Sequence, residues 1–423
     1  MKFLFVTNES LSADLAWQLK KEGHDVKMYC HDQTEKDVGL GFFEKVEDWE
    51  PLKDWADVII FDDIGFGAKA DQLRNEGKFV VGGSPYTDKL ELDREFGQSE
   101  LNAAGVDILP SWNFTSFDEA GNFVKANPDR YVLKPSGKAQ NEKELLFIGQ
   151  EADGKDIQLV LEHYKANWSK KIKEFLMQKF AEGVEIAVGA FFNGKDFVMP
   201  ICVNFEHKRL FPHELGPSTG EMGTSTYYTR TSPVFERTLL KMKEKLAASR
   251  YVGYIDINCI ANVKGIWPLE WTARFGYPTI SIQMEGITSE WGQFLFDLAH
   301  GNETQLKTKK GYQVGVVVAI PPWPFEDEKA FKKYSEGATI LFRRQSLDGI
   351  HIGEVKLEEG DWHIAGSSGY ALVVTGSGAT MADAIENAYQ SVRNIMIPNM
   401  FYRSDIGERW THDSDKLLSW GYI

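Results

Sequence analysis

The stretch YVGYIDINCIANVKGIWPLEWTARFGYPTISIQM, residues 251–284, decides the fold. Residues 254–260 are apolar and rich in β-branched side chains, which is typical of a buried strand. Residues 262–265 form a predicted turn, and residues 266–271 form a predicted return strand. The stretch therefore predicts an antiparallel hairpin around which the rest of the chain is arranged.

Two carboxylates, Asp256 and Glu270, interrupt these apolar runs. A buried carboxylate is costly unless a cation or hydrogen bonds satisfy it, and paired strands could bring both acids to one place. Mg²⁺ prefers hard oxygen ligands of this kind, and the planar guanidinium of Arg274 is well suited to binding phosphate. The alternative is two surface acids at strand ends and an arginine in a salt bridge, and the stretch alone favours neither.

Composition limits the classes of function. A chain of 423 residues is long enough for two or three domains. The formal charge of −15 argues against binding to a nucleic-acid backbone, but a phosphorylated small molecule needs only a local basic pocket. The scattered Cys30, Cys202 and Cys259 show no metal or redox spacing, which fits a reduced, cytoplasmic setting. Neither a secretory signal nor a bilayer-spanning apolar run is visible, so we expect no membrane partner.

The first 88 residues alternate between apolar strands and helices, which predicts a parallel, Rossmann-like sheet with helices on its faces. The expected strands are 2–7, 26–30, 57–61 and 79–82. Ligands on such sheets bind beyond the carboxyl ends of the strands, here at loops 8–12, 62–67 and 82–86. The first loop lacks the Gly-rich dinucleotide pattern, so we predict no nicotinamide site.

Residues 109–190 predict a separate small α+β unit. Lys134 ends one of its strands and is followed by a polar segment, 137–143, which could be a mobile loop over phosphates or a solvated hairpin. The predicted strand 174–179 leads toward Glu185. The backbone at such a strand edge can bind adenine, and an acid just beyond it can hold ribose hydroxyls.

Two further polar segments follow. The run EHKR at 206–209 precedes GPSTGEMG at 216–223. Cationic side chains beside a Gly/Ser/Thr loop with free backbone N–H groups can cradle anionic oxygens. The alternative for the Gly-rich half alone is a long surface loop.

The rest of the chain predicts helices and a last α+β unit. Residues 88–104, 234–249 and 288–299 each read as one helix, and 301–311 as a polar linker. Strands are expected at 313–320, 338–342, 351–356 and 370–375, before a helix that a capping box opens at Thr380.

Three features thus stand in order: a lysine at a strand end with a polar loop, a hinge strand ending in an acid, and a hairpin with two acids. This order resembles the ATP-grasp superfamily and, more closely, the glycinamide ribonucleotide synthetase (phosphoribosylamine–glycine ligase) family. The resemblance runs from residue 92 almost to the C-terminus, and its combined motifs are specific. The matching segments are 92–96, 132–134, 177–185, 206–209, 216–223, 270–278, 315–317 and 402–407.

The resemblance implies sites for ATP and for Mg²⁺ or Mn²⁺ between the small unit and the central domain. It assigns cofactor contacts to Arg94, Lys134, Lys143, Gln178, Lys179, Phe180 and Glu185. It assigns catalysis to Arg274, Lys208 and Glu270. Substrate contacts fall to Glu206, Gly216, Pro217, Ser218, Thr219, Gly220, Asn8 and Ser10. The expected metal ligands are Asp256, by analogy with D-alanine ligases, and Glu270, with Thr272 peripheral.

The implied fold is an N-terminal Rossmann-like domain (1–88), an ATP-grasp region (89–310) with a lid subdomain at about 115–188, and a small C-terminal α+β domain (311–423). The implied reaction belongs to purine biosynthesis: ATP phosphorylates the carboxylate of glycine, and the amine of phosphoribosylamine attacks the acyl phosphate. Cations and Mg²⁺ would stabilise the transition state. The expected partners are small molecules, and the expected state is a monomer or homodimer.

The amine side departs from the family. The family's first loop is Gly-rich, whereas residues 7–14 read TNESLSAD, and a family Gly-Pro-Glu run is replaced by FDDIGF at 61–66. Tyr277 and Thr279 replace family acids. Two alternatives therefore stay open: the same chemistry with another amine, and a nucleotide-binding protein that has lost catalysis.

Overall fold

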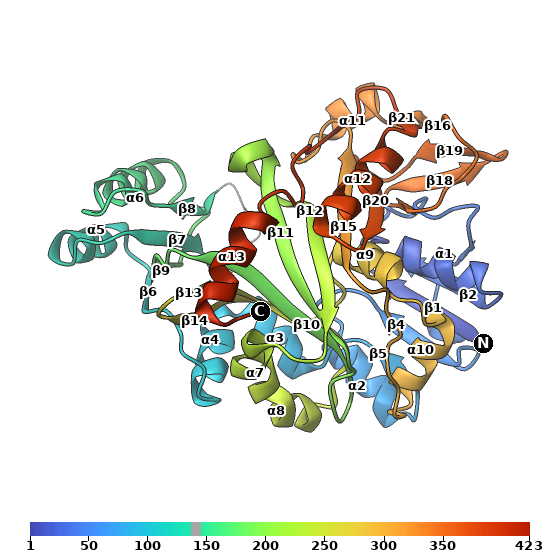
Figure 1. The fold of residues 1–423 in the computed structure, drawn as a ribbon, viewed down its shortest axis with the longest axis horizontal. Coiled ribbons are helices and arrows are strands. Elements are labelled where there is room, and N and C mark those ends of the chain that lie inside the picture. Colours follow the sequence, from blue (N-terminus) through green and yellow to red (C-terminus); the bar gives the residue numbers. More distant parts are fainter. Residues whose placement is uncertain (137–144) are drawn as a thin grey trace.

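The computed structural model describes residues 1–136 and 145–423, and its N-terminal part is a parallel sheet (Figure 1). The strand order is β3-β2-β1-β4-β5, and every pair is parallel. The predicted alternation of strands and helices is therefore confirmed. The elements are β1 Lys2–Thr7, α1 Ala13–Lys21, β2 Asp25–Cys30, β3 Glu44–Lys45, η1 Glu50–Leu52, β4 Val58–Phe61, α2 Gly67–Asn75 and β5 Val80–Val81.

The small unit projects from the rest of the molecule, at the left of Figure 1. Its sheet has the order β6-β9-β7-β8, and all of its pairs are antiparallel. Two helices, α5 and α6, pack on each other beside this sheet. The elements are β6 Ser111–Phe114, α5 Phe117–Ala126, β7 Tyr131–Pro135, β8 Phe147–Ile148, α6 Lys155–Asn167 and β9 Phe175–Lys179.

A large antiparallel sheet forms the centre, with the order β14-β13-β10-β11-β12-β15-β20-β17. The predicted hairpin is confirmed as its β13–β14 edge, and the sheet continues past residue 310 into the C-terminal strands. The central elements are β10 Val184–Asn193, β11 Ile201–Phe211, η4 Pro212–Glu214, β12 Leu215–Thr229, α7 Pro233–Arg237, η5 Leu239–Met242, α8 Lys243–Ala248, β13 Val252–Asn262, β14 Gly265–Thr272, α9 Thr279–Gly286 and α10 Trp291–Ala299.

The C-terminal strands β15, β17 and β20 belong to this sheet, and a second small sheet, β18-β19-β16-β21, lies beside it. The capping box at Thr380 is confirmed at the start of α12. None of the helices in residues 1–136 and 145–423 is long and apolar enough to cross a bilayer. The elements are β15 Tyr312–Ala319, α11 Glu328–Tyr334, β16 Thr339–Phe342, β17 Ile350–Ile352, β18 Val355–Glu358, β19 Asp361–Ile364, β20 Tyr370–Gly378, α12 Met381–Val392, β21 Ile395–Met396, β22 Phe401–Tyr402 and α13 Trp410–Trp420.

Two predicted helices are interrupted. Residues 88–104 divide into α3 Pro85–Leu92 and α4 Arg94–Ala103, because Asp93 is extended and its side chain accepts the N–H of Phe96 as an N-cap. Residues 234–249 divide into α7, η5 and α8, with a non-helical Thr238 after the first piece.

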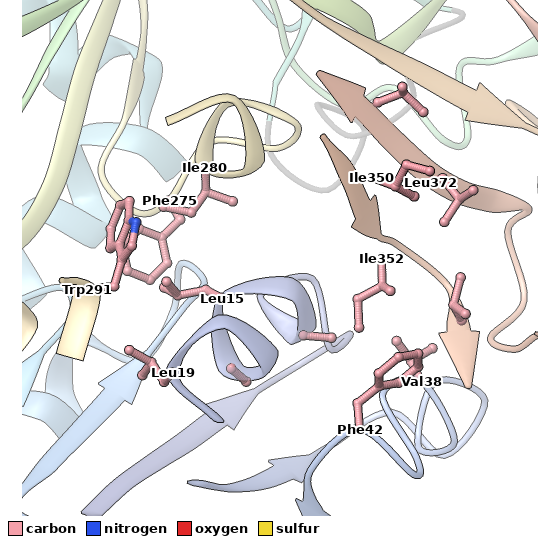
Figure 2. Close-up of a cluster of buried hydrophobic side chains, with 14 of the residues drawn as sticks. Leu15, Leu19, Val38, Phe42, Phe275, Ile280, Trp291, Ile350, Ile352 and Leu372 are labelled. Carbon is pink, nitrogen blue, oxygen red and sulfur yellow. The ribbon is translucent and has the colours of Figure 1, made fainter. Parts of the chain in front are cut away.

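One apolar core joins the N-terminal sheet to the later parts of the chain (Figure 2). Leu15 and Leu19 of α1 face Phe275 and Trp291 on one side. On the other side of α1 lie the β17 and β20 side chains, among them Ile352. Because α1 is held from both sides, the carboxyl edge of the N-terminal sheet has a fixed position relative to the central sheet.

Candidate active site

Lys208 lies at the centre of the site. It extends from β11, and its Nζ is 2.8 Å from Glu270 Oε1, 3.0 Å from Glu185 Oε1 and 3.2 Å from Glu206 Oε2. Burial opposes its charge, but these three carboxylates hold the pKa of Lys208 well above its ordinary value. Lys208 in turn is the main reason that the pKa of Glu270 is far below its usual range. Four predicted residues from three strands are thus together.

Asn258 completes this cluster, and the sequence analysis missed it. Its Nδ2 donates to Glu185 Oε1 at 3.0 Å and to Glu206 Oε2 at 2.9 Å. It lies on β13 directly opposite Glu270. Its Oδ1 is buried and accepts no hydrogen bond from the residues that the structure describes. Only the strand register could have revealed it, because Asn258 carries no charge and belongs to no motif.

Asp256 and Glu270 lie on neighbouring strands of the predicted hairpin but are not directly opposite each other. The β13–β14 register places Asp256 opposite Thr272, and Glu270 lies two pairs further along, on the same face. Burial and the charge of Glu206 raise the pKa of Asp256 well above its ordinary value, while a hydrogen bond from Thr272 lowers it. Thr272 thus contacts the acid expected to bind metal, and its peripheral position relative to the metal stays a prediction.

Cationic side chains approach the cluster from the small unit and from α4. Lys134 Nζ donates to Gln178 Oε1 at 2.8 Å, and Arg94 Nη1 donates to the carbonyl of Pro135 at 3.0 Å. Burial and the neighbouring charge of Arg94 lower the pKa of Lys134 to about 8. Two cations held this close are a suitable place for phosphate oxygens. Lys143 lies outside the described residues.

At the hinge after β9, where the backbone is expected to bind adenine, two N–H groups already have partners. The backbone N–H of Lys179 donates to the carbonyl of Pro110, and that of Phe180 donates to the carbonyl of Arg130, both at 2.9 Å. These two donors are therefore already used within the protein. Adenine would have to bind the carbonyl groups at this hinge or the backbone that follows it.

Arg274 lies between the cluster and the N-terminal sheet. Its Nη2 is 3.3 Å from Glu91 Oε1, its Nε is 3.8 Å from Asp63 Oδ1, and Nη1 donates to the carbonyl of Phe275. Burial opposes the charge, but Glu91 and Asp63 hold the pKa of Arg274 above its ordinary value. Nearby, Tyr277 Oη donates to the carbonyl of Asp62 at 2.9 Å.

The Gly-rich segment 216–223 is a strand, and its prediction as a loop is wrong. It lies in β12 and pairs with β11, with Arg209 opposite Ser218. Within this segment, all of which the structure describes, only Ser218 and Gly223 have a register partner on β11, because the pairing shifts on both sides of Arg209. Its expected contact with anionic substrate stays a prediction. Thr219 has a different contact: its Oγ1 donates to the carbonyl of Lys208 at 2.9 Å.

The loop after β1 places Asn8 and Ser10 at the carboxyl edge of the N-terminal sheet, where several carboxylates form an acidic edge. Asn8 Nδ2 donates to Asp63 Oδ2 at 3.4 Å, and Ser10 Oγ donates to the carbonyl of Glu35 at 3.3 Å. Burial and the charges of Asp63 and Asp32 raise the pKa of Glu9. Burial also raises the pKa of Asp62 to about 7. This edge carries several carboxylates close together.

A divalent cation fits the residues at the hairpin. Among the residues that the structure describes, no group of three or more His, Cys, Asp or Glu side chains could hold a metal by itself. Mg²⁺, however, is commonly held by one or two carboxylates together with substrate phosphates. The partnerless oxygens Asp256 Oδ1 and Asn258 Oδ1 lie on the same face of the hairpin as Glu270.

Two family models and several curated relatives match most of the chain. Residues 93–280 match the ATP-grasp (A) domain of phosphoribosylglycinamide synthetase, and residues 313–409 match its C domain. The phosphoribosylamine–glycine ligase of Streptococcus pneumoniae is 24% identical over 389 residues, which cover 88% of each chain. That of Listeria monocytogenes is 25% identical over 395 residues, covering 91% of this chain and 90% of the relative.

Solved structures confirm the predicted multidomain ATP-grasp fold. Phosphoribosylamine–glycine ligase from Thermotoga maritima superposes with a TM-score of 0.72 at 20% identity, covering 96% of this chain and 100% of that one. The biotin carboxylase domain of 2-oxoglutarate carboxylase from Hydrogenobacter thermophilus gives a TM-score of 0.64 at 13% identity, covering 95% and 91%. That structure is a complex with MgADP, ADP and bicarbonate.

Proposed function

The chain belongs to the phosphoribosylglycinamide synthetase family of ATP-grasp proteins, and we propose that it is an ATP-dependent ligase that joins the carboxylate of glycine to the amine of phosphoribosylamine. The observation that carries the proposal is the cluster of Lys208 with Glu185, Glu206 and Glu270, beside Lys134 and Arg94. This arrangement lies between the small unit and the central sheet, where the ATP-grasp resemblance puts the nucleotide.

The reaction follows from the charges of its substrates. A carboxylate resists attack by an amine, so one of its oxygens first attacks the γ-phosphorus of ATP, and ADP leaves. The amine nitrogen then attacks the acyl carbon and loses a proton, and phosphate leaves with the carboxylate oxygen. Because two anions must meet, Lys134, Lys208 and Arg274 lower the barrier by offsetting their charge. None of these steps needs a nucleophilic side chain.

The hairpin would hold the metal. Glu270, with Asp256 and Asn258, would bind Mg²⁺, which supplies positive charge to the transferring phosphoryl group. Glu185 would bind ribose, with its orientation fixed by Lys208 and Asn258. Removing divalent cations with a chelator should therefore stop turnover.

A second candidate keeps this chemistry and changes the acceptor. The observation that favours it is the acidic edge of the N-terminal sheet, where Glu9, Asp32, Asp62 and Asp63 would face an acceptor bound beyond the strand ends. A phosphate group is repelled by carboxylates, whereas a second ammonium group is attracted to them.

One assay separates the candidates. ADP release is measured with glycine and phosphoribosylamine, and then with a panel of amines that differ in charge. Release that depends on phosphoribosylamine supports the first proposal, and release with another amine alone supports the second. ATP binding without turnover on any amine would instead indicate a nucleotide-binding protein that has lost catalysis.

A further inference from the structure

The hairpin that carries Lys208 has a strained tip. Strand β11 ends at Phe211, and β12 begins at Leu215. Between them, His213 and Glu214 both adopt left-handed backbone conformations, with φ of 61° and 59°. Residues other than glycine keep such angles only where surrounding contacts hold them.

The contacts come from a buried arginine near the C-terminus. Arg403 is 1% exposed, and its Nη1 donates to the carbonyl of Arg209 at 3.0 Å. Its Nη2 donates to the carboxylate of Glu214, and its Nε donates to Asp405 Oδ1 at 2.6 Å. The other oxygen of Asp405 accepts the backbone N–H of His213 at 2.9 Å. One guanidinium and one carboxylate thus hold the hairpin at three points.

Neighbouring side chains on β11 point in opposite directions. His207 is buried toward the C-terminal segment, and its Nε2 accepts the N–H of Gly407 at 3.4 Å. Lys208 points to the other face, among its three carboxylates. The carbonyl that Arg403 binds belongs to the residue directly after Lys208. A shift of the hairpin would therefore move Lys208 Nζ away from its partners.

We propose that Arg403 is a positioning residue, which acts with Asp405 through the β11–β12 hairpin to hold Lys208 in the catalytic cluster. The inference rests on the ligase activity proposed above. The alternative is that Arg403 stabilises the fold and has no effect through Lys208. Nothing in the reaction scheme places Arg403 in contact with ATP or with the acceptor.

A double-mutant cycle separates these alternatives. Arg403→Gln should lower kcat between about tenfold and a hundredfold, because a displacement of about 1 Å costs this much. Arg403→Lys, which keeps the charge but reaches fewer acceptors, should recover part of the loss. In a Lys208→Met background, Arg403→Gln should lower the residual rate less than twofold, since the residue it positions is gone. An equal loss in both backgrounds would overturn the proposal.

A second measurement does not depend on turnover. Hydrogen exchange of the amides in residues 207–216 should become faster in Arg403→Gln and stay unchanged in Arg393→Gln, a matched control whose exposed side chain pairs with Glu386. If Arg403→Gln does not fold, Glu214→Gln loosens the tip alone and should give a smaller change of the same sign. Unchanged exchange in the folded variants would refute the proposal. If the wild type shows no ligase activity but the exchange pattern holds, the proposed function has failed and the hairpin contact has not.

Discussion

The two ends of the site differ in charge, because cations and carboxylates are mixed beside the small unit, whereas carboxylates predominate at the N-terminal sheet. At the small unit, Lys134, Arg94 and Lys208 converge on the face of the central sheet, and the residues there follow the ATP-grasp pattern. At the N-terminal sheet, Glu9 and Asp63 occupy the region where the family resemblance places the amine. We infer that different residues serve phosphoryl transfer and the choice of acceptor in this molecule. Arg274 lies near both regions, since it is close to Asp63 and its charge acts on Asp256 of the hairpin.

The largest expected effect comes from substitutions that remove a charged side chain needed for phosphoryl transfer. Glu270→Ala should lower kcat by at least about a hundredfold, which is roughly 3 kcal/mol of transition-state stabilisation, because it removes the proposed metal ligand and a partner of Lys208. Arg274→Ala should have a similar effect. Steady-state ADP release measures both. The exposed Glu386→Ala is the control, and near-wild-type rates in Glu270→Ala or Arg274→Ala would contradict the assignment.

A change of pH should affect the phosphate region specifically. The pKa of Lys134 is lowered to about 8, so its ammonium is charged below that pH and loses its proton above it. Because phosphate binds the charged form, the KM for ATP should rise several-fold between pH 7 and pH 9. Lys134→Arg keeps its charge throughout and should remove the dependence. An identical pH profile in wild type and Lys134→Arg would show that Lys134 does not bind phosphate.

A smaller effect is expected for a substitution at the acidic edge, where the acceptor is proposed to bind. Glu9→Gln removes one exposed carboxylate from the acidic edge, and salt screens such charges. We expect a threefold to tenfold change in the KM of the acceptor, with the KM of ATP unchanged. A rise would indicate a cationic acceptor, and a fall would indicate a phosphorylated one. No change in either constant would exclude Glu9 from the acceptor site.

The smallest effect on activity is expected for two buried acids, Glu35 and Glu354, which lie where the N-terminal domain meets the C-terminal strands. Burial raises the pKa of Glu35 to about 7 and that of Glu354 to about 8, and Glu35 adds to the second shift. Acids with raised pKa bind more protons when folded, so stability should fall as pH rises from about 4.5 to about 8 and stay level above that. The slope is about 1.4 kcal/mol per pH unit for each carboxyl group.

Thermal melting across this pH range measures the effect. Glu354→Gln mimics the protonated acid and should flatten most of the fall in stability. A wild-type stability that rises over the same range would contradict the assigned direction. The turnover rate at pH 7 should change little, because neither acid lies in the Lys208 cluster.

The sequence predicted strands correctly where apolar runs and turn residues alone determine the local structure. Lys2–Thr7 and the β13–β14 hairpin follow directly from apolar runs and turn residues. The sequence analysis assigned no element to the residues of α9, because this helix is buried almost all round and rich in β-branched residues, so no 3.6-residue periodicity is visible. The segment 216–223 looked like a loop because glycine and serine favour turns, yet it is part of strand β12 and is held to β11 at Ser218 and Gly223.

The charged members of the site could be predicted, and its geometry could not. Lys208, Glu185 and Glu270 belong to recognisable motifs, and the structure brings them together. Which acid lies opposite which residue depends on the register of β13 and β14, and that register contains an irregularity after Asn258. The roles of Asn258 and Arg403 depend on contacts between distant segments.

In the proposed reaction a carboxylate oxygen of glycine passes to phosphate during turnover, and an isotope-transfer experiment follows that oxygen. Glycine labelled with ¹⁸O in its carboxylate is incubated with ATP, Mg²⁺ and phosphoribosylamine, and the released phosphate is analysed by mass spectrometry. The account predicts one ¹⁸O atom in each phosphate formed. Phosphate without label, released at the same rate as ADP, would mean that water attacks ATP and would contradict an acyl phosphate intermediate.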